Sequence, residues 1–452
     1  MKKPIALLLA VTLVLSGCGG KEISYEAKPK QEVVETEQTE PTEALEQIEC
    51  AGTDAMPWEN AEVADFGIRL LRASMEEGEN TLISPLSVLA ALSMTANGAA
   101  GETLSQMETV LGQSKDALNN WYKEDMGKDS DYLHLSNALF IKDDPELTVS
   151  ESFIKTIERY YMGENYASDV VMTLFNEYTV DGINQYVEDS TNGMIKNILD
   201  KIPDNAVMYL INALAFEARW AIPYNEYAVQ ENVFTTEDGR EQPVKLMYSE
   251  EYDVYLEDEL FTGFVKDYEG GRYAFVALLP KEGVSVKEVT DTLSVADITD
   301  KINSRWGGMV LTGLPKFQTE FDAEMSEVLK TMGMTDAFDS NKADFSSLAT
   351  YNGGNIFLNR VLHKTFISVA EQGTRAGAAT VIEAAAEAAM EPEEPKAVIL
   401  NRPFLYMIWD TEGNMPVFMG TFVDAQAQGT SIPADDPGIF YSPAEDPCQM
   451  EG

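Results

Sequence analysis

The apolar pattern changes along the chain, and this change most constrains the fold. In the first half, Ala61–Leu71 has helical spacing, and Ser84–Ser93 is a capped and almost entirely apolar stretch, which predicts a buried helix. In the second half, apolar runs at Tyr273–Pro280 and Leu405–Trp409 predict buried strands, and a short turn after the second leads to a partner strand at Val417–Val423. Helices first and strands later indicate an α+β domain with large sheets, not a doubly wound one.

The net charge and the small numbers of histidine and cysteine limit which ligands and partners the protein can bind. The 452 residues carry 76 acidic and 32 basic side chains, a formal charge of −44, which repels a phosphate backbone and excludes nucleic acid. Two histidines and three cysteines are too few for a His-based metal site or a disulfide scaffold, so we expect no metal and no cofactor. The chain has no Gly-x-Ser-x-Gly elbow, His-Glu-x-x-His pair or phosphate-binding glycine loop, which argues against an enzyme.

The N-terminus is predicted to be an export signal. Lys2 and Lys3 precede an apolar run, Ile5–Leu15, which is too short to span a bilayer. Small residues then lead into Cys18, as in a bacterial lipoprotein signal. We therefore predict a signal peptide at 1–17 and lipidation of Cys18, giving a membrane-anchored protein on the bacterial cell surface. The alternative is an ordinary secretory signal with a chance cysteine.

Two polar segments flank the predicted folded domain at 58–424. Residues 18–57 are rich in Glu, Thr, Gln and Pro, which predicts a disordered acidic tether. Residues 425–452 are predicted to be an acidic, Pro-containing tail. Cys50 and Cys448 lie in these flanks, where they either form a disulfide in an oxidising exterior or remain free thiols.

Several short blocks within this domain follow one another in the order found in a known family. They are Asn80–Ser87, Leu135–Phe140, Thr191–Ile195, Ile211–Trp220, Leu314–Phe317, Asn401–Leu405 and Phe418–Gly420. Taken together, they resemble the serpins. The resemblance implies a fold of three β-sheets and about eight or nine helices, with an exposed reactive-centre loop near the C-terminus. We expect a monomer whose partner is a target serine protease.

The segment 371–382 resembles the serpin hinge, the first part of that loop. The hinge residues implied are Glu371, Gly373, Thr374, Ala376, Gly377, Ala378, Ala379 and Thr380. The family's mechanism requires this segment to enter a sheet as a new central strand after cleavage. Alternate residues from Thr374 to Ala386 are small or apolar, whereas Arg375, Glu383 and Glu387 fall on the other face. Arg375 stands where the family often has Glu.

The segment also lacks proline up to Met390, so a strand of about 14 residues, roughly 46 Å long, can form. Taken alone, the Ala- and Glu-rich stretch Glu383–Met390 equally suits a surface helix or a spacer. Its place between the hinge and the Asn401–Leu405 block favours a bait loop.

The position of the scissile bond depends on the direction of counting. The family's spacing from the hinge places it between Glu387 and Ala388, whereas counting back from Asn401 places it nearer Pro392; we favour the first. Glu387 suits a Glu-preferring protease, and the alternative positions Ala386, Ala389 and Met390 are also candidate baits. Because alanine dominates, we predict an elastase-like serine protease. A cysteine protease is an alternative, and no Lys or Arg lies between 377 and 394 to attract a trypsin-like enzyme.

A second group of residues matches the positions that control sheet opening in serpins. The resemblance implies a hydrogen-bonded shutter of His363, Ser84, Ser87 and Asn212, and places Trp220 where the hinge enters the sheet. The alternatives are a core histidine without a gating role and an ordinary core aromatic. His134 is interpreted as structural.

The function implied is irreversible inhibition of a protease by a suicide substrate. The alternative is a non-inhibitory serpin that proteases merely cleave, or a binding or carrier module. Residues 113–120, where some serpins bind heparin, form no basic patch, so we expect no activation by a polyanion.

Overall fold

The computed structural model describes residues 58–126, 132–161, 167–203, 206–374 and 396–433, and the statements below concern these residues. They belong to one compact unit. The predicted signal peptide, the tether and residues 375–395 of the loop lie outside them.

Nine α-helices occur in the described residues, and six of them precede residue 200. Helix α2 shows why the chain folds this way: Pro85 occupies its first turn, the Ser84 hydroxyl caps it by accepting the Ser87 N–H, and eleven of its residues are buried. The predicted buried helix is therefore confirmed. The helices are α1 Trp58–Ser74, α2 Pro85–Ala96, α3 Gly101–Leu111, α4 Lys115–Trp121, α5 Glu151–Tyr160, α6 Glu177–Ser190, α7 Val286–Thr292, α8 Val295–Asn303 and α9 Ser326–Met332.

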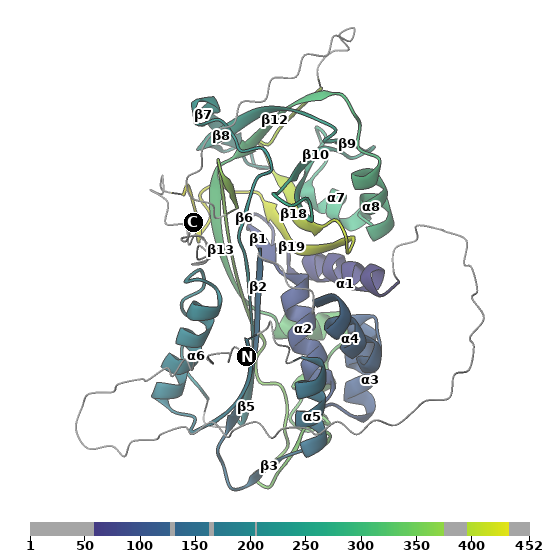
Figure 1. The fold of residues 1–452 in the computed structure, drawn as a ribbon, viewed down its shortest axis with the longest axis vertical. Helices are drawn as coiled ribbons and strands as arrows, with labels where there is room; N and C mark the ends of the chain where they lie inside the picture. Colours follow the sequence, from purple (N-terminus) through teal and green to yellow (C-terminus); the bar gives the residue numbers. More distant parts are fainter. Residues whose placement is uncertain (1–57, 127–131, 162–166, 204–205, 375–395, 434–452) are drawn as a thin grey trace, which may run out of the picture. The chain divides into compact units, whose positions relative to one another are not determined.

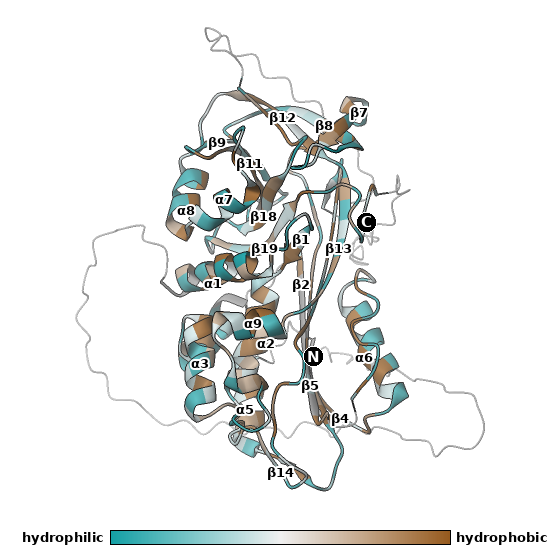
Figure 2. Cartoon of the chain, turned by 180° about the vertical axis from the view of Figure 1, so that it is seen from behind, coloured by the Kyte–Doolittle hydropathy of each residue, from teal (hydrophilic) through white to brown (hydrophobic). Residues whose placement is uncertain are grey.

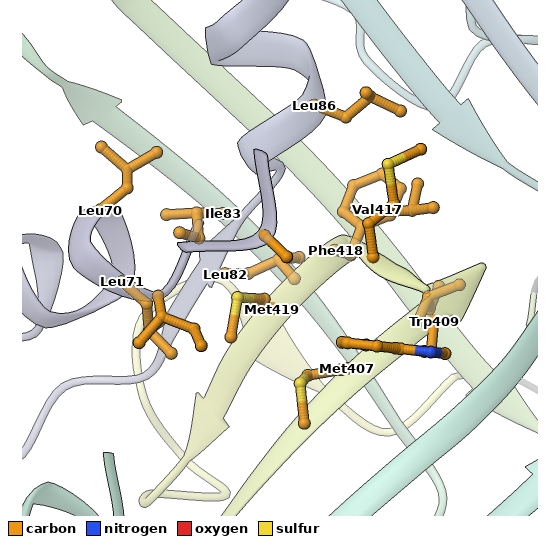
Figure 3. Packing of buried hydrophobic residues seen from close by; sticks show 14 of the residues in the cluster. Leu70, Leu71, Leu82, Ile83, Leu86, Met407, Trp409, Val417, Phe418 and Met419 are labelled. Carbon is orange, nitrogen blue, oxygen red and sulfur yellow. The ribbon is translucent and has the colours of Figure 1, made fainter. Parts of the chain in front are cut away.

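A six-stranded antiparallel sheet forms the centre of the core. Its strands, in spatial order, are β1 Thr81–Ile83, β19 Met415–Phe422, β18 Phe404–Asp410, β11 Tyr273–Pro280, β10 Phe261–Asp267 and β9 Tyr255–Glu257. Every residue of β11, β18 and β19 is buried, as the apolar runs predict. Leu71 of α1 belongs to the same buried hydrophobic cluster as Met407 and Met419 of this sheet (Figure 3). Figure 2 shows hydrophobic colour on β18 and hydrophilic colour over much of α7 and α8.

Two smaller sheets complete the periphery. In the four-stranded sheet, β17 Lys396–Ile399 lies parallel to β12 Met309–Pro315, followed by β8 Glu241–Tyr252 and β7 Val229–Thr235. Strand β17 begins where the undescribed part of the loop ends. A two-stranded pair consists of β3 Leu147–Val149 and β14 Ala349–Tyr351.

The largest sheet is hydrogen-bonded in two parts. One part contains β4 Ala167–Thr173, β2 Leu133–Lys142 and β5 Met208–Phe216; the other contains β20 Thr430–Ser431, β13 Phe317–Glu324, β15 Leu362–Ala370, β16 Gly373–Thr374 and β6 Ala218–Arg219. Only Glu217 separates β5 from β6, and its N–H donates to Tyr132 O at 2.9 Å, so the two parts share one long strand. Helix α2 lies on one side of this sheet and α6 on the other (Figure 1).

This arrangement confirms the predicted α+β architecture, with the largest of the expected three sheets divided. Residues 425–433, which follow the predicted domain, are also described, and they contribute β20, which pairs with β13. The Asn80 Nδ2 group fixes this extension by donating to Asp424 O at 2.7 Å and to Thr430 Oγ1 at 3.0 Å.

Candidate functional site

The first hinge residues already form a strand. Strand β16 pairs antiparallel with β15 through Val369 and Thr374, and on its other side with β6 through Thr374 and Ala218. Gly373 has a φ of 155°, and a Cβ there would lie 2.1 Å from Ala218 O, so glycine alone fits this position. Two residues of the predicted hinge therefore lie between two strands of the large sheet.

Aromatic side chains fix the point where the hinge enters. The Trp220 backbone N–H donates to Gln372 O and its indole Nε1–H to Ala370 O, both at 2.9 Å. Its ring stacks on Tyr268 at 4.4 Å between centroids, and the Tyr268 hydroxyl hydrogen-bonds with the Thr374 hydroxyl. The structure thus places Trp220 beside Gln372 of the segment that resembles the hinge. Tyr268 was missed, because no sequence signal marks a tyrosine that meets the hinge from 106 residues away.

Two ion pairs lie beside this entry point. Lys316 Nζ is 3.0 Å from Glu371 Oε1, and both side chains are largely buried. Lys266, which is 1% exposed, pairs with Glu251 and lies 4.3 Å from the centroid of the Tyr224 ring. Burial lowers the pKa of Lys266, and the negative charge of Glu251 opposes this shift. Removing one partner of this pair would leave an uncompensated buried charge.

The predicted shutter residues are brought together in part. His363 Nε2 accepts the Ser84 backbone N–H at 3.1 Å, and the Ser84 hydroxyl donates to Val417 O at 3.0 Å. The same hydroxyl accepts the Ser87 N–H at 3.2 Å. Burial lowers the pKa of His363 to about 4, so the ring is neutral at pH 7 and, because Nε2 accepts, Nδ1 carries the proton. Asn212 lies in β5 opposite Asn137, and its side chain is not among those that the structure describes.

A cavity is lined by the first residues of both β5 and β15, at the end of these strands away from β16. It has a volume of about 110 Å³ and is lined from both faces of the sheet layer, by Val88 and Leu92 of α2 and by Tyr209 and Ile211 of β5. Ile211 packs with α6, on the opposite face from α2. The segment 355–363, which leads into β15, forms another part of the wall, and Phe345, Leu348 and Tyr351 also line the cavity. We call this space the slot cavity; it continues the line of β16 between β5 and β15.

The other predicted site residues lie outside the described residues. They are Ala376, Gly377, Ala378, Ala379 and Thr380 of the hinge, the reactive-bond candidates Ala386, Glu387, Ala388, Ala389 and Met390, and Cys18. The side chain of His134 in β2 is likewise undescribed. Across the described ranges, no helix is long and apolar enough to cross a bilayer. The same ranges contain no group of three His, Cys, Asp or Glu side chains placed to hold a metal ion.

Comparison with known proteins decides the family. Residues 61–425 match the sequence profile of the family described as serpin (serine protease inhibitor). The chain is a serpin. This family consists generally of protease inhibitors and not of enzymes.

The relatives include proteins of archaea and animals. This serpin is 30% identical over 371 residues to an uncharacterized serpin-like protein of Thermococcus kodakarensis, covering 80% of this chain and 84% of that protein. It is 27% identical to intracellular coagulation inhibitor 2 of Tachypleus tridentatus, covering 79% and 89% of the two chains. Among solved structures, it resembles the thermophilic serpin tengpin in the native state with 42% identity and a TM-score of 0.75, covering 83% of this chain and 96% of tengpin.

Proposed function

We propose that this serpin is an irreversible suicide-substrate inhibitor of serine proteases that inserts its cleaved hinge into the large sheet. The observation that carries the proposal is the position of β16: it lies between β15 and β6, in line with the slot cavity. A strand growing from Thr374 would continue between β5 and β15 towards this cavity, whose lining includes Ile211 of β5 and His363 of β15.

The register of β16 supports insertion. Thr374 pairs with Val369 on one side and with Ala218 on the other, and both neighbours are buried. Continuing this pairing one residue at a time places Thr380 opposite His363 in β15 and opposite Asn212 in β5. The hinge and the predicted shutter would therefore meet at one level of the sheet.

The side-chain pattern agrees with this register. Thr374 faces the interior, so the alternate residues Ala376, Ala378, Thr380 and Ile382 would face it too, all small or apolar. Arg375 and Glu383 would lie on the opposite face. Insertion therefore buries no charge on the α2 side of the sheet, where an unpaired charge would be most costly.

Trapping of the protease depends on whether the hinge inserts faster than the ester between the two proteins is hydrolysed. The serine of the protease attacks the carbonyl carbon of the scissile bond, the amine half leaves, and an ester joins the protease to the new C-terminus of the hinge. Water would normally hydrolyse this ester. Insertion of about 14 residues carries the ester roughly 46 Å along the sheet before hydrolysis. At about 1 kcal/mol for each hydrogen bond formed, the new strand supplies on the order of 10 kcal/mol to distort the attached protease.

We place the scissile bond between Glu387 and Ala388 and assign an elastase-like target, because alanine dominates residues 384–389. The test is incubation of the full protein with elastase, followed by denaturing gel electrophoresis and N-terminal sequencing of the released fragment. We expect a covalent complex that survives denaturation and a fragment that begins at Ala388. A Thr380→Arg variant should be cleaved without complex formation, because a large cation would enter the interior face.

Other outcomes identify the alternatives. A nicked chain without complex from the unmodified protein would contradict inhibition and support a non-inhibitory serpin. A covalent complex that forms only with a Glu-preferring or a cysteine protease would support the trapping mechanism. It would contradict the assignment of an elastase-like target.

We also propose that Cys18 anchors the protein at the bacterial cell surface, on the basis of the N-terminal signal. A Cys18→Ser variant should then leave the membrane fraction. Retention of that variant in the membrane fraction would exclude a lipid anchor at this residue.

A further inference from the structure

The slot cavity differs from the rest of the molecule in charge. The whole chain contains 76 acidic residues, yet none of the 22 described residues that line the cavity is Asp or Glu. Among these described residues, Arg360 carries the only formal charge. Most of the remaining lining is apolar, including Leu92, Phe345 and Ile356. The cavity thus offers an apolar wall and one positive charge in a strongly anionic protein.

Two hydrogen-bond donors of this lining have no acceptor among the described residues. One is His363 Nδ1–H: the ring is 4% exposed, lines the cavity and uses its other nitrogen to accept the Ser84 N–H. The other is the exposed Arg360 guanidinium, whose positive charge acts on Tyr209 across the cavity. A donor in an apolar pocket is stabilised by an acceptor, most strongly by an anionic one.

The chain's own loop contains matching acceptors. Continuing the register of β15 and β16 would place Thr380 opposite His363 after insertion, and pairing that ran on beyond Leu362, the first residue of β15, would place Glu383 opposite Arg360. The apolar Ile382 lies between them in the sequence. The chemistry that suits the slot is therefore an apolar group joined to a carboxylate.

We propose that the slot cavity of the uncleaved protein binds a short-chain aliphatic monocarboxylate, with the carboxylate at Arg360 and the alkyl chain among α2, β5 and the segment 355–363. The bound ligand occupies the path of the inserting strand and opposes it. The binding site stands on the cavity itself, whereas its regulatory effect rests on the proposed function.

The cavity volume limits the length of the alkyl chain. An apolar cavity of about 150 Å³ admits benzene, so the slot cavity of about 110 Å³ admits a chain of a few carbons with its head group at the mouth. Each methylene group buried there should raise the affinity about fourfold. Affinity should therefore rise from butyrate to hexanoate by about fifteenfold and then level off as longer chains outgrow the cavity.

Calorimetric titration of the full, uncleaved protein tests binding with four probes: butyrate, hexanoate, decanoate and hexylammonium. We expect one hexanoate site per molecule, and hexylammonium should not bind because its cation would face Arg360. Arg360→Gln should weaken hexanoate at least tenfold. Ala91→Leu, which fills part of the lining, should weaken it without changing the charge.

The matched control is Arg159→Gln, which removes an exposed arginine on α5, away from the cavity. It should bind hexanoate like the unmodified protein. Absence of hexanoate binding, or equal affinity of the unmodified protein and both cavity variants, would overturn the proposal. Equal binding of hexylammonium and hexanoate would overturn the assignment of an anionic ligand.

The regulatory effect has a separate readout. With hexanoate at ten times its dissociation constant, the ratio of covalent complex to nicked chain should fall severalfold for the unmodified protein and stay constant for Arg360→Gln. A constant ratio in both proteins would exclude regulation. If no protease yields a complex, the proposed function fails, and calorimetry still decides whether the site exists.

Discussion

His363 is a histidine that the fold holds in its neutral form. It is 4% exposed, its Nε2 accepts a backbone N–H, and burial lowers its pKa from 6.5 to about 4. Protonation would place a proton on the nitrogen that accepts the Ser84 N–H and would bury a charge next to α2. The hydrogen bond between Ser84 and His363 is therefore sensitive to pH.

The sign of this effect follows from the two pKa values. Between pH 6.5 and 4 the unfolded state binds more protons at this residue than the folded state, so the free energy of unfolding falls as the pH falls. Above pH 6.5 His363 does not reduce the free energy of unfolding. At pH 5 it lowers that free energy by about 2 kcal/mol. Denaturant unfolding at pH 7.5 and pH 5 measures it, and a His363→Gln variant should lack this part of the pH dependence. Equal pH dependence of the two proteins would contradict a neutral buried His363.

At the scale of secondary-structure elements, β16 is the decisive feature. It is only two residues long, yet it joins β15 to β6 and determines the register in which further hinge residues would pair. Its conformation depends on Gly373, because a side chain at that position would collide with the backbone of Ala218.

We expect Gly373→Ala to displace β16 from β6 and to slow the start of insertion. The substitution combines a strained φ with a contact of 2.1 Å, a cost of about 1–3 kcal/mol. More of the loop should then be hydrolysed before trapping, so several times more inhibitor should be consumed for each protease molecule inactivated.

The control for this prediction is Gly239→Ala. Gly239 also has a positive φ, of 83°, but a Cβ there meets nothing within 4 Å. That variant should consume the same amount of inhibitor as the unmodified protein. An unchanged ratio for Gly373→Ala would show that β16 does not start insertion.

At the scale of the whole molecule, the large sheet is incomplete. Its two parts share the strand formed by β5 and β6, no ladder pairs β5 with β15 in the described residues, and a cavity is lined by the first residues of both strands. Filling this gap with a strand from the same chain would add hydrogen bonds and remove the cavity. The folded state before cleavage is therefore expected to be kinetically trapped above a more stable one.

We predict that cleavage at the loop raises the melting temperature by about 15 °C or more, since on the order of 10 kcal/mol is gained in a large domain. Differential scanning calorimetry of intact and nicked protein measures the difference. Nicked Thr380→Arg protein should not show the increase. A nicked form that melts no higher than the intact one would rule out stored energy in the sheet.

The sequence determined which segments become strands and helices, and which alternate residues of the hinge are compatible with a sheet interior. Continuous apolar runs such as Tyr273–Pro280 are stable only when both faces are covered, so their burial could be predicted without coordinates. The order of motifs likewise identified the family.

Only the tertiary structure decided where the hinge enters, what holds it and which gap it would fill. Thr374 meets Tyr268, and Ser84 meets His363, across 106 and 279 residues of chain. Local patterns carry no information about such pairs, because the pairing of distant strands depends on how the whole sheet is assembled. The same applies to the slot cavity, whose lack of acidic residues is visible only once α2, β5 and the segment 355–363 are brought together.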